Sequence, residues 1–202
     1  MSNTGRPRKS ATEGAIVNAV AELVIERGYA RVTVDEVVAR AGTNKPAFYR
    51  RFRDLAAVVP HILASRHGTD EDIDTGSLVE DLIEVQRRQL RLFTDPVVTS
   101  GFAGWIAEVQ AHPTDGESFL AEYLLPRRSF TSVILDRAVQ RGEIAPGADP
   151  AWIADLLTGP LLIRVMLPGL PPIDVALITN TVNAALDALG YSGDRSCITD
   201  EG

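Results

Sequence analysis

Residues 33–53 read TVDEVVARAGTNKPAFYRRFR, and this stretch decides the fold of the N-terminal part of the chain. Thr33 and Glu36 have the spacing of a capping box, and the apolar stripe behind them predicts a short helix that ends at Gly42. Asn44 is expected to cap a second short helix, which carries a proline in its first turn. Two short helices separated by a glycine turn have the anatomy of a helix-turn-helix, whose second helix enters the major groove of DNA.

The second short helix also has the chemistry of a DNA-reading surface. It presents cationic, hydroxyl and small apolar groups together; cations and hydroxyls hold phosphates, while small groups approach base edges. Thr33 is expected to bind a phosphate oxygen in addition to capping its helix. Phe48 and Phe52, four residues apart, are expected to pack in the core rather than to stack on bases. The DNA-binding candidates are Thr33, Thr43, Asn44, Lys45, Ala47, Tyr49, Arg50 and Arg53.

Charge is distributed unevenly along the chain, whose net charge is −7. Residues 1–53 carry ten basic and five acidic groups, and the remainder carries 10 basic and 22 acidic groups. A basic end joined to an acidic remainder is expected where one part of a protein binds a polyanion. Arg6, Arg8 and Lys9 belong to an N-terminal arm, residues 1–9, that either reaches into the minor groove or is disordered.

The composition argues against several other classes of protein. No apolar run approaches the roughly 18 residues that cross a bilayer, and the basic N-terminus does not resemble a secretory signal. The single Cys197 excludes an intramolecular disulfide and a cysteine-built zinc site, and His112 has no partner at metal-ligand spacing. We therefore expect a cytoplasmic protein with no membrane span, no metal, no cofactor and no catalytic activity.

Helical periodicity, with no convincing strand pattern, predicts an all-α fold of about nine helices. The first helix is expected to begin at a capping box formed by Ser10 and Glu13. Beyond the helix-turn-helix, helices are expected at 54–65, 77–93, 95–111, 117–141, 149–167 and 172–189. The predicted division is a basic arm at 1–9, a three-helix helix-turn-helix domain at 10–53, a connecting helix and loop at 54–76, a larger helical domain at 77–190 and a disordered tail at 191–202.

The first 55 or so residues resemble the DNA-binding domain of the TetR family of bacterial transcriptional regulators. The motifs that carry the resemblance are ERGYARVTV at 26–34, VDEVVARAG at 34–42 and NKPAFYRRF at 44–52. The resemblance implies that Thr33 and Tyr49 touch the DNA backbone and that the side chains nearest the base edges are those of Thr43, Lys45, Pro46, Ala47 and Arg50. One departure is Asp54-Leu55, which stands where the family has Ser-Lys, so that Arg53 is expected to replace the missing cation.

The same resemblance implies a ligand cavity and a dimer interface in the domain at 77–190. Aromatic side chains at helical spacing are more often core than ligand contacts, but Trp105, Tyr123 and Arg164 are the candidates for an effector pocket. The last two helices carry more apolar surface than one face of a small domain normally covers, and in the family such helices pair across a two-fold axis. The interface candidates are Ile153, Leu157, Leu161, Ile178, Val182 and Leu186; the alternative is an ordinary intrachain core.

These expectations combine into one function and two alternatives. The resemblance implies a homodimeric repressor that binds a palindromic operator in double-stranded DNA and is released by a small, largely apolar effector. One alternative is a helical small-molecule-binding protein or enzyme whose basic N-terminus docks to an acidic partner. The other is a regulator of the same family that has no effector.

Overall fold

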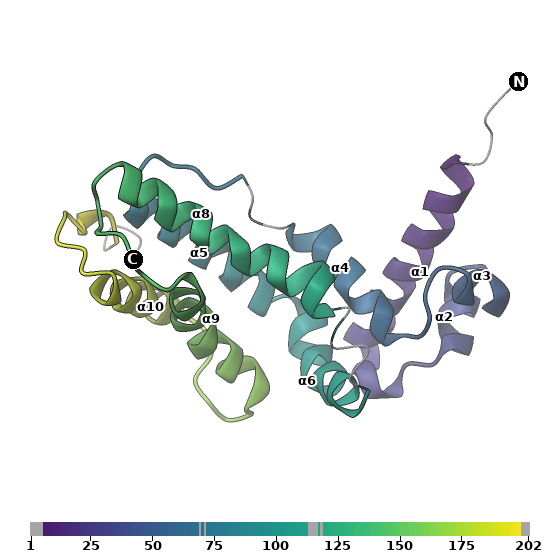
Figure 1. Ribbon diagram of the computed structural model, residues 1–202. Coiled ribbons are helices and arrows are strands. Elements are labelled where there is room, and N and C mark those ends of the chain that lie inside the picture. Colours follow the sequence, from purple (N-terminus) through teal and green to yellow (C-terminus); the bar gives the residue numbers. More distant parts are fainter. Residues whose placement is uncertain (1–5, 69, 71, 113–116, 118, 199–202) are drawn as a thin grey trace, which may run out of the picture. The chain divides into compact units, whose positions relative to one another are not determined.

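The computed structural model describes residues 6–68, 70, 72–112, 117 and 119–198, and over these residues the chain is all-helical, as predicted (Figure 1). The helices are α1 (Arg6–Arg27), α2 (Val34–Arg40), α3 (Lys45–Tyr49), α4 (Val59–His67), α5 (Leu78–Phe93), α6 (Pro96–Ala111), α8 (Leu125–Gln140), α9 (Pro150–Met166) and α10 (Val175–Ala188). Short 3-10 turns lie at η1 (Tyr29–Arg31), η2 (Ala56–Val58) and η4 (Ser196–Ile198), and a π-helical turn, η3 (Leu120–Leu124), precedes α8.

The chain forms two compact units. The N-terminal unit comprises Met1–Gly68 and Pro96–Tyr123, and the C-terminal unit comprises Thr69–Asp95 and Leu124–Gly202. The segment that contains α6 thus packs with the N-terminal unit, although the sequence placed it inside one continuous domain at 77–190. The functional roles of the two units stay predictions.

A glycine on α6 explains why this helix packs against α1. A Cβ added to Gly101 would lie 2.3 Å from Cγ1 of Val24, so the two helices approach each other more closely than any larger residue would allow. Trp105, one turn further along α6, is 1% exposed and donates its indole N–H to the carbonyl of Ala56 at 3.2 Å. These contacts join residues far apart in the sequence, which helical periodicity does not register.

Side-chain caps set most helix starts where the sequence predicted them. The Ser77 hydroxyl accepts the backbone N–H of Glu80 at 3.2 Å, and Asp149 accepts that of Ala151 at 2.9 Å. The starts of α1, α4 and α10 differ from the prediction. Helix α4 begins at Val59 rather than behind Asp54, whose carboxylate accepts the N–H of Ala57 in the preceding 3-10 turn η2. Helix α1 begins at Arg6 rather than at Ser10, and the proline in its first turn is compatible with this start because first-turn N–H groups have no partner within the helix. Helix α10 begins at Val175, where Asp174 rather than a proline is the cap.

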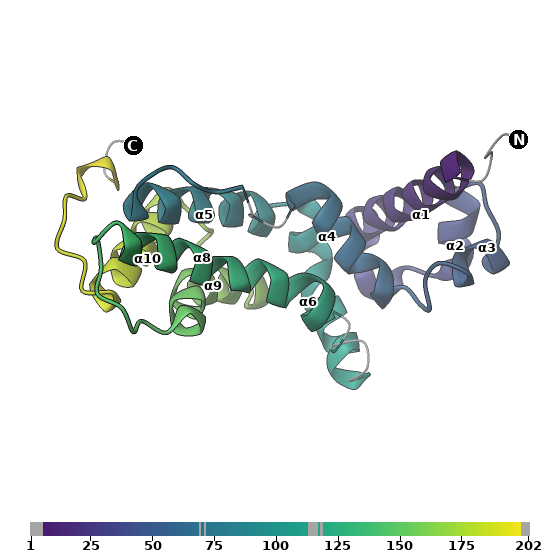
Figure 2. The same ribbon diagram turned by 45° about the horizontal axis from the view of Figure 1, so that its top comes forward.

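The C-terminal unit has one hydrophobic core, to which α5, α8, α9 and α10 contribute. Figure 2 shows the ribbons of these four helices from a second direction. The prediction of a disordered tail is wrong for residues 191–198, because these residues fold onto this core. Ile198 is 7% exposed and belongs to the core cluster, and Arg195 forms an ion pair with Asp187 on α10 at 2.7 Å. Residues 199–202 lie outside the described part of the chain.

Candidate DNA-binding site

Helices α2 and α3 form the predicted helix-turn-helix, and short-range hydrogen bonds fix its shape. The capping box at the start of α2 is present: Thr33 Oγ1 accepts the N–H of Glu36 at 3.4 Å, and the Glu36 carboxylate accepts the N–H of Thr33 at 3.2 Å. Helix α2 ends at Arg40, just before Gly42, whose φ of +62° favours glycine, and the N–H of Thr43 donates to the carbonyl of Val38 at 2.9 Å. Asn44 then caps α3 by accepting the N–H of Ala47 at 2.9 Å.

The inner faces of these helices are buried, as the apolar pattern predicted. Val37 on α2 and Phe48 on α3 are fully buried, and Phe52 is 3% exposed. The ring of Phe48 lies 5.9 Å from that of Phe52, and the ring of Phe52 meets His61 of α4 edge-on at 5.1 Å. The two phenylalanines are therefore core residues and leave the opposite side of α3 to solvent.

Ion pairs hold α2 against α1. The guanidinium of Arg40 makes a two-pronged contact with Glu26, with Nη2 and Oε2 2.9 Å apart, and Arg27 pairs with Glu36 of the capping box. The hydrogen bond from Arg40 lowers the pKa of the Glu26 carboxyl, and the same contact raises the pKa of Arg40. Arg27 and Arg40 are therefore engaged by carboxylates of the scaffold and present little free charge to a partner.

The predicted DNA-binding side chains fall into two groups in the structure. Thr33, Asn44, Lys45, Pro46, Tyr49, Arg50 and Arg53 are exposed, on one short stretch of surface that begins at the cap of α2 and ends just beyond α3. Thr43 is half-buried and Ala47 is 8% exposed, so these two offer less area to a base edge than the sequence suggested. Tyr49, at 55% exposure, is a large solvent-facing aromatic on α3.

The cations of this surface differ in their partners. Lys45 Nζ lies 2.8 Å from Asp35 Oδ1 on α2, and Arg53 Nε lies 2.7 Å from Asp54 Oδ2. The Asp35 carboxylate, through its hydrogen bond and charge, raises the pKa of Lys45. Arg51 instead donates to the carbonyl of Ala47 at 2.9 Å.

Arg31 and Arg50 are exposed, and within the residues that the structure describes neither side chain has a hydrogen bond or an ion pair. Arg50 was a predicted contact. Arg31 was counted among the basic residues but was not a predicted contact, although its position two residues before the Thr33 cap could have marked it as a further DNA-binding candidate. Arg6, Arg8 and Lys9 lie in the first turn of α1, of which the structure describes the backbone, so the minor-groove arm stays a prediction.

The predicted effector-pocket residues do not share one unit. Trp105 and Tyr123 belong to the N-terminal unit, where Phe119 lies between them with its ring 4.5 Å from that of Trp105 and 5.7 Å from that of Tyr123. Both are at most 4% exposed. Arg164 lies on α9 of the C-terminal unit and is half-buried.

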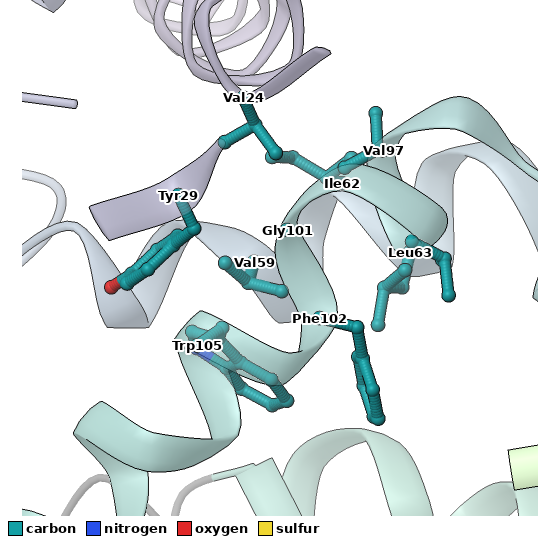
Figure 3. A pocket seen from close by; sticks show the side chains of 10 residues that line it. Val24, Tyr29, Val59, Ile62, Leu63, Val97, Gly101, Phe102 and Trp105 are labelled. Atoms are coloured by element: carbon teal, nitrogen blue, oxygen red, sulfur yellow. The ribbon is translucent and has the colours of Figure 1, made fainter. Parts of the chain in front are cut away.

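Trp105 lines a small apolar recess between α1, α4 and α6, shown in Figure 3. Val24 from α1, Ile62 from α4 and Phe102 from α6 border it, and its volume of about 10 Å³ is room for about one water molecule. Burial, and next the nearby Glu108 carboxylate, raise the pKa of the Tyr29 hydroxyl on its rim. The recess in this state is a packing defect of the N-terminal unit and is too small for an effector.

The structure corrects the predicted dimer contacts. All six side chains are at most 8% exposed within a single chain: Ile153, Leu157, Leu161, Ile178, Val182 and Leu186. The apolar stripes of α9 and α10 pack against α5, against α8 and against each other, so they are not surplus apolar surface. Apolar side chains that do face solvent on this part of the chain are Trp152, Ile163, Leu167, Leu170 and Val175.

None of the helices in the described part of the chain has a stretch long and apolar enough to cross a membrane. Across the residues that the structure describes, no group of three or more His, Cys, Asp and Glu side chains is placed to hold a metal ion.

Comparisons with known proteins agree with the geometry. Residues 16–61 match the model of bacterial regulatory proteins of the tetR family, and residues 72–185 match the tetracyclin repressor-like C-terminal domain. The chain is 30% identical over 169 residues to YdeS of Bacillus subtilis, an uncharacterised HTH-type transcriptional regulator, which covers 83% of this chain and 85% of the relative. It is 30% identical over 190 residues to the DNA-binding transcriptional repressor TetR of Mycobacteroides abscessus, covering 93% and 98%.

A solved structure, the TetR family transcription regulator SCO0332, superposes with a TM-score of 0.71 at 24% identity and covers 88% of this chain and 97% of its own. A helix-turn-helix followed by a larger set of helices defines a DNA-binding transcriptional regulator. The chain belongs to the TetR family of bacterial regulators, as its sequence motifs indicated.

Proposed function

We propose that this regulator is a repressor that binds a palindromic operator as a homodimer and leaves it when a small, largely apolar effector binds. The observation that carries the proposal is the exposed side of α3, which carries Lys45 and Tyr49 and is followed directly by the exposed Arg50, while Phe48 anchors the other side of the helix. The repressor sense is supported by the relative from Mycobacteroides abscessus, whose name is that of a DNA-binding transcriptional repressor.

DNA recognition is assigned to residues 45–52 in the major groove of each half-site. The side chain of Arg50 is exposed and has no partner in the described part of the chain, and its planar fork of donors suits the two acceptors of a guanine. Tyr49 and the Thr33 hydroxyl, at the end of α3 and the start of α2, are assigned to backbone phosphates. A dimer presents two such helices to half-sites about 34 Å apart, one turn of the duplex.

Dimerisation is assigned to the solvent-facing side of α9 and the start of α10. Trp152 is 54% exposed, Ile163 is 47% exposed and Val175 is 52% exposed, and large apolar side chains that face solvent favour a protein partner. A two-fold axis lets the same patch on two copies cover itself. The stripe predicted from the sequence is already buried within one chain, so the proposal does not include it.

Effector release requires that the effector bind the operator-free form more tightly than the operator-bound form. The coupling between the two ligands equals this difference in affinity, whichever contacts produce it. Trp105, Tyr123 and Arg164 remain the first positions to substitute. Because the recess beside Trp105 holds about one water, an effector there has to move α6 or the aromatic ring to gain room.

The experiment that tests the proposal is selection of genomic DNA fragments by the purified protein, followed by footprinting of the selected fragments. The proposal expects a protected palindrome with two half-sites and binding that weakens steeply with salt, because neutralised phosphates release counterions. Recovery of fragments without a shared sequence, at any salt concentration, contradicts it.

A further inference from the structure

The ion pair between Lys45 and Asp35 joins the two helices of the helix-turn-helix on their solvent side. Lys45 is the first residue of α3 and Asp35 lies in the first turn of α2, and their charged atoms are 2.8 Å apart. The side chains are 52% and 73% exposed, respectively. A carboxylate thus lies on the surface assigned to DNA, where every approaching phosphate is negative.

The pair contributes little to holding α2 and α3 together. Exposed ion pairs are weak, because water screens the charges and two long side chains must be ordered. The two helices are already fixed by the hydrogen bond from Thr43 to Val38 and by the burial of Val37 and Phe48. The carboxylate of Asp35 therefore acts mainly on the charge of Lys45.

We propose that Asp35 makes the recognition helix α3 selective for DNA sequence by holding Lys45 in an ion pair. The pair leaves the ammonium group of Lys45 able to donate to a base edge but removes the net attraction of Lys45 for phosphate. The ammonium group has three N–H donors, of which Asp35 uses one, and the others suit the O6 and N7 acceptors of guanine. On DNA of the wrong sequence those acceptors are missing, and the neutral pair gains little from the backbone. The inference rests on the proposed DNA-binding function.

Asp35 is distinct from the other acidic residues of this unit. Glu36 is occupied by the capping box and by Arg27, and Glu26 is occupied by Arg40, so both stabilise the scaffold. Asp54 pairs with Arg53 but also accepts the N–H of Ala57 at 2.9 Å, which gives it a structural task. Among the described contacts, that with Lys45 is the one the structure shows for the Asp35 carboxylate.

The test is the substitution Asp35→Asn, which keeps the size of the side chain and removes its charge. Binding is measured by fluorescence anisotropy on a random-sequence duplex and on a duplex selected by the wild-type protein, at salt concentrations from 50 to 200 mM. Freeing one cation per protomer steepens the salt dependence on the random duplex by about 0.9 in slope. When the salt concentration falls from 200 to 50 mM, the affinity of the variant for the random duplex therefore rises about 3-fold more, per bound protomer, than that of the wild type. The preference for the selected duplex falls by a similar factor.

Two controls separate this effect from others. Asp136→Asn makes the same charge change at an exposed position on α8, and it should leave both affinities within about 2-fold. In a Lys45→Ala background, Asp35→Asn should lose most of its effect on the salt slope and on the preference for the selected duplex, because the two residues act as a pair. A role of Asp35 in stabilising α2 alone would leave the effect intact in that background.

The outcomes are distinct. A wild-type protein that binds neither duplex contradicts the proposed function itself. A wild-type protein that binds the selected duplex, together with an Asp35→Asn variant of unchanged salt slope and preference, overturns the inference and leaves the proposed function standing. An equal effect of Asp35→Asn with and without Lys45 also overturns it.

Discussion

The substitution Gly101→Ala adds a single methyl group where α6 packs on α1. A Cβ at this position meets Cγ1 of Val24 at 2.3 Å, far inside ordinary contact distance. Gly14 on α1 is a matched control, because nothing lies within 4 Å of a Cβ placed there. Replacing a helical glycine by alanine stabilises by about 1 kcal/mol where space is open, and overpacking costs about 1–3 kcal/mol. We therefore expect Gly101→Ala to be less stable than Gly14→Ala by about 1–3 kcal/mol.

Removing the opposing side chain should reverse this loss. Val24→Ala alone costs about 2 kcal/mol, since Val24 is 1% exposed and its truncation leaves a cavity. The double variant with Gly101→Ala fills part of that cavity, so it should be more stable than the sum of the single effects by about 2 kcal/mol. Urea denaturation followed by circular dichroism measures all four proteins. Additivity within about 0.5 kcal/mol, or equal effects of the two glycine substitutions, would refute the close approach of α6 and α1.

Three further predictions concern other parts of the chain. Thr33→Ala should destabilise the protein by about 0.5–2 kcal/mol through loss of the α2 cap and Thr33→Ser should not, as thermal unfolding would show; equal melting temperatures for the two variants would contradict the cap. Asp81→Ala should cost about 1.5–3 kcal/mol in urea denaturation, because the fully buried carboxylate accepts both the N–H and the hydroxyl of Thr75; a loss below about 1 kcal/mol would argue against these bonds. Trp152→Glu should weaken dimerisation at least 10-fold in sedimentation equilibrium without a change in helicity, and an unchanged dissociation constant would place the interface elsewhere.

Local signals in the sequence predicted the helix-turn-helix well. The cap at Thr33, the stop at Gly42 and the cap at Asn44 each depend on a few neighbouring residues, and the structure confirms all three. The burial of Phe48 follows from spacing alone, for the same reason. Such features need no knowledge of the rest of the chain.

Features that depend on distant contacts were not predictable in the same way. Helix α6 belongs with α1 because Gly101 permits a close approach, and a glycine within a helical pattern does not reveal its partner. Residues 191–198 fold back because Ile198 packs in the core of the C-terminal unit. An apolar stripe such as that of Leu157 and Val182 has the same pattern whether it faces another helix of its own chain or a second copy.

The ion pair of Asp35 with Lys45 was likewise missed, although both residues lie in the stretch that decides the fold. Their separation of ten positions spans the turn between two helices, so no helical spacing rule joins them. The pair alters the interpretation of the basic N-terminal region. Much of its positive charge is already neutralised by neighbouring carboxylates, and Arg50 is left as the cation best placed to read DNA.

Footprinting of a wild-type-selected operator with Arg50→Ala and Lys45→Ala tests the central claim, that α3 reads a DNA sequence, most directly. Each substitution removes one side chain from the exposed face of α3 and leaves its buried anchor Phe48 in place. We predict that each variant keeps the wild-type circular dichroism spectrum and oligomeric state and loses roughly 10- to 100-fold in operator affinity. Protection of the same operator by the double variant at wild-type protein concentrations would contradict the claim.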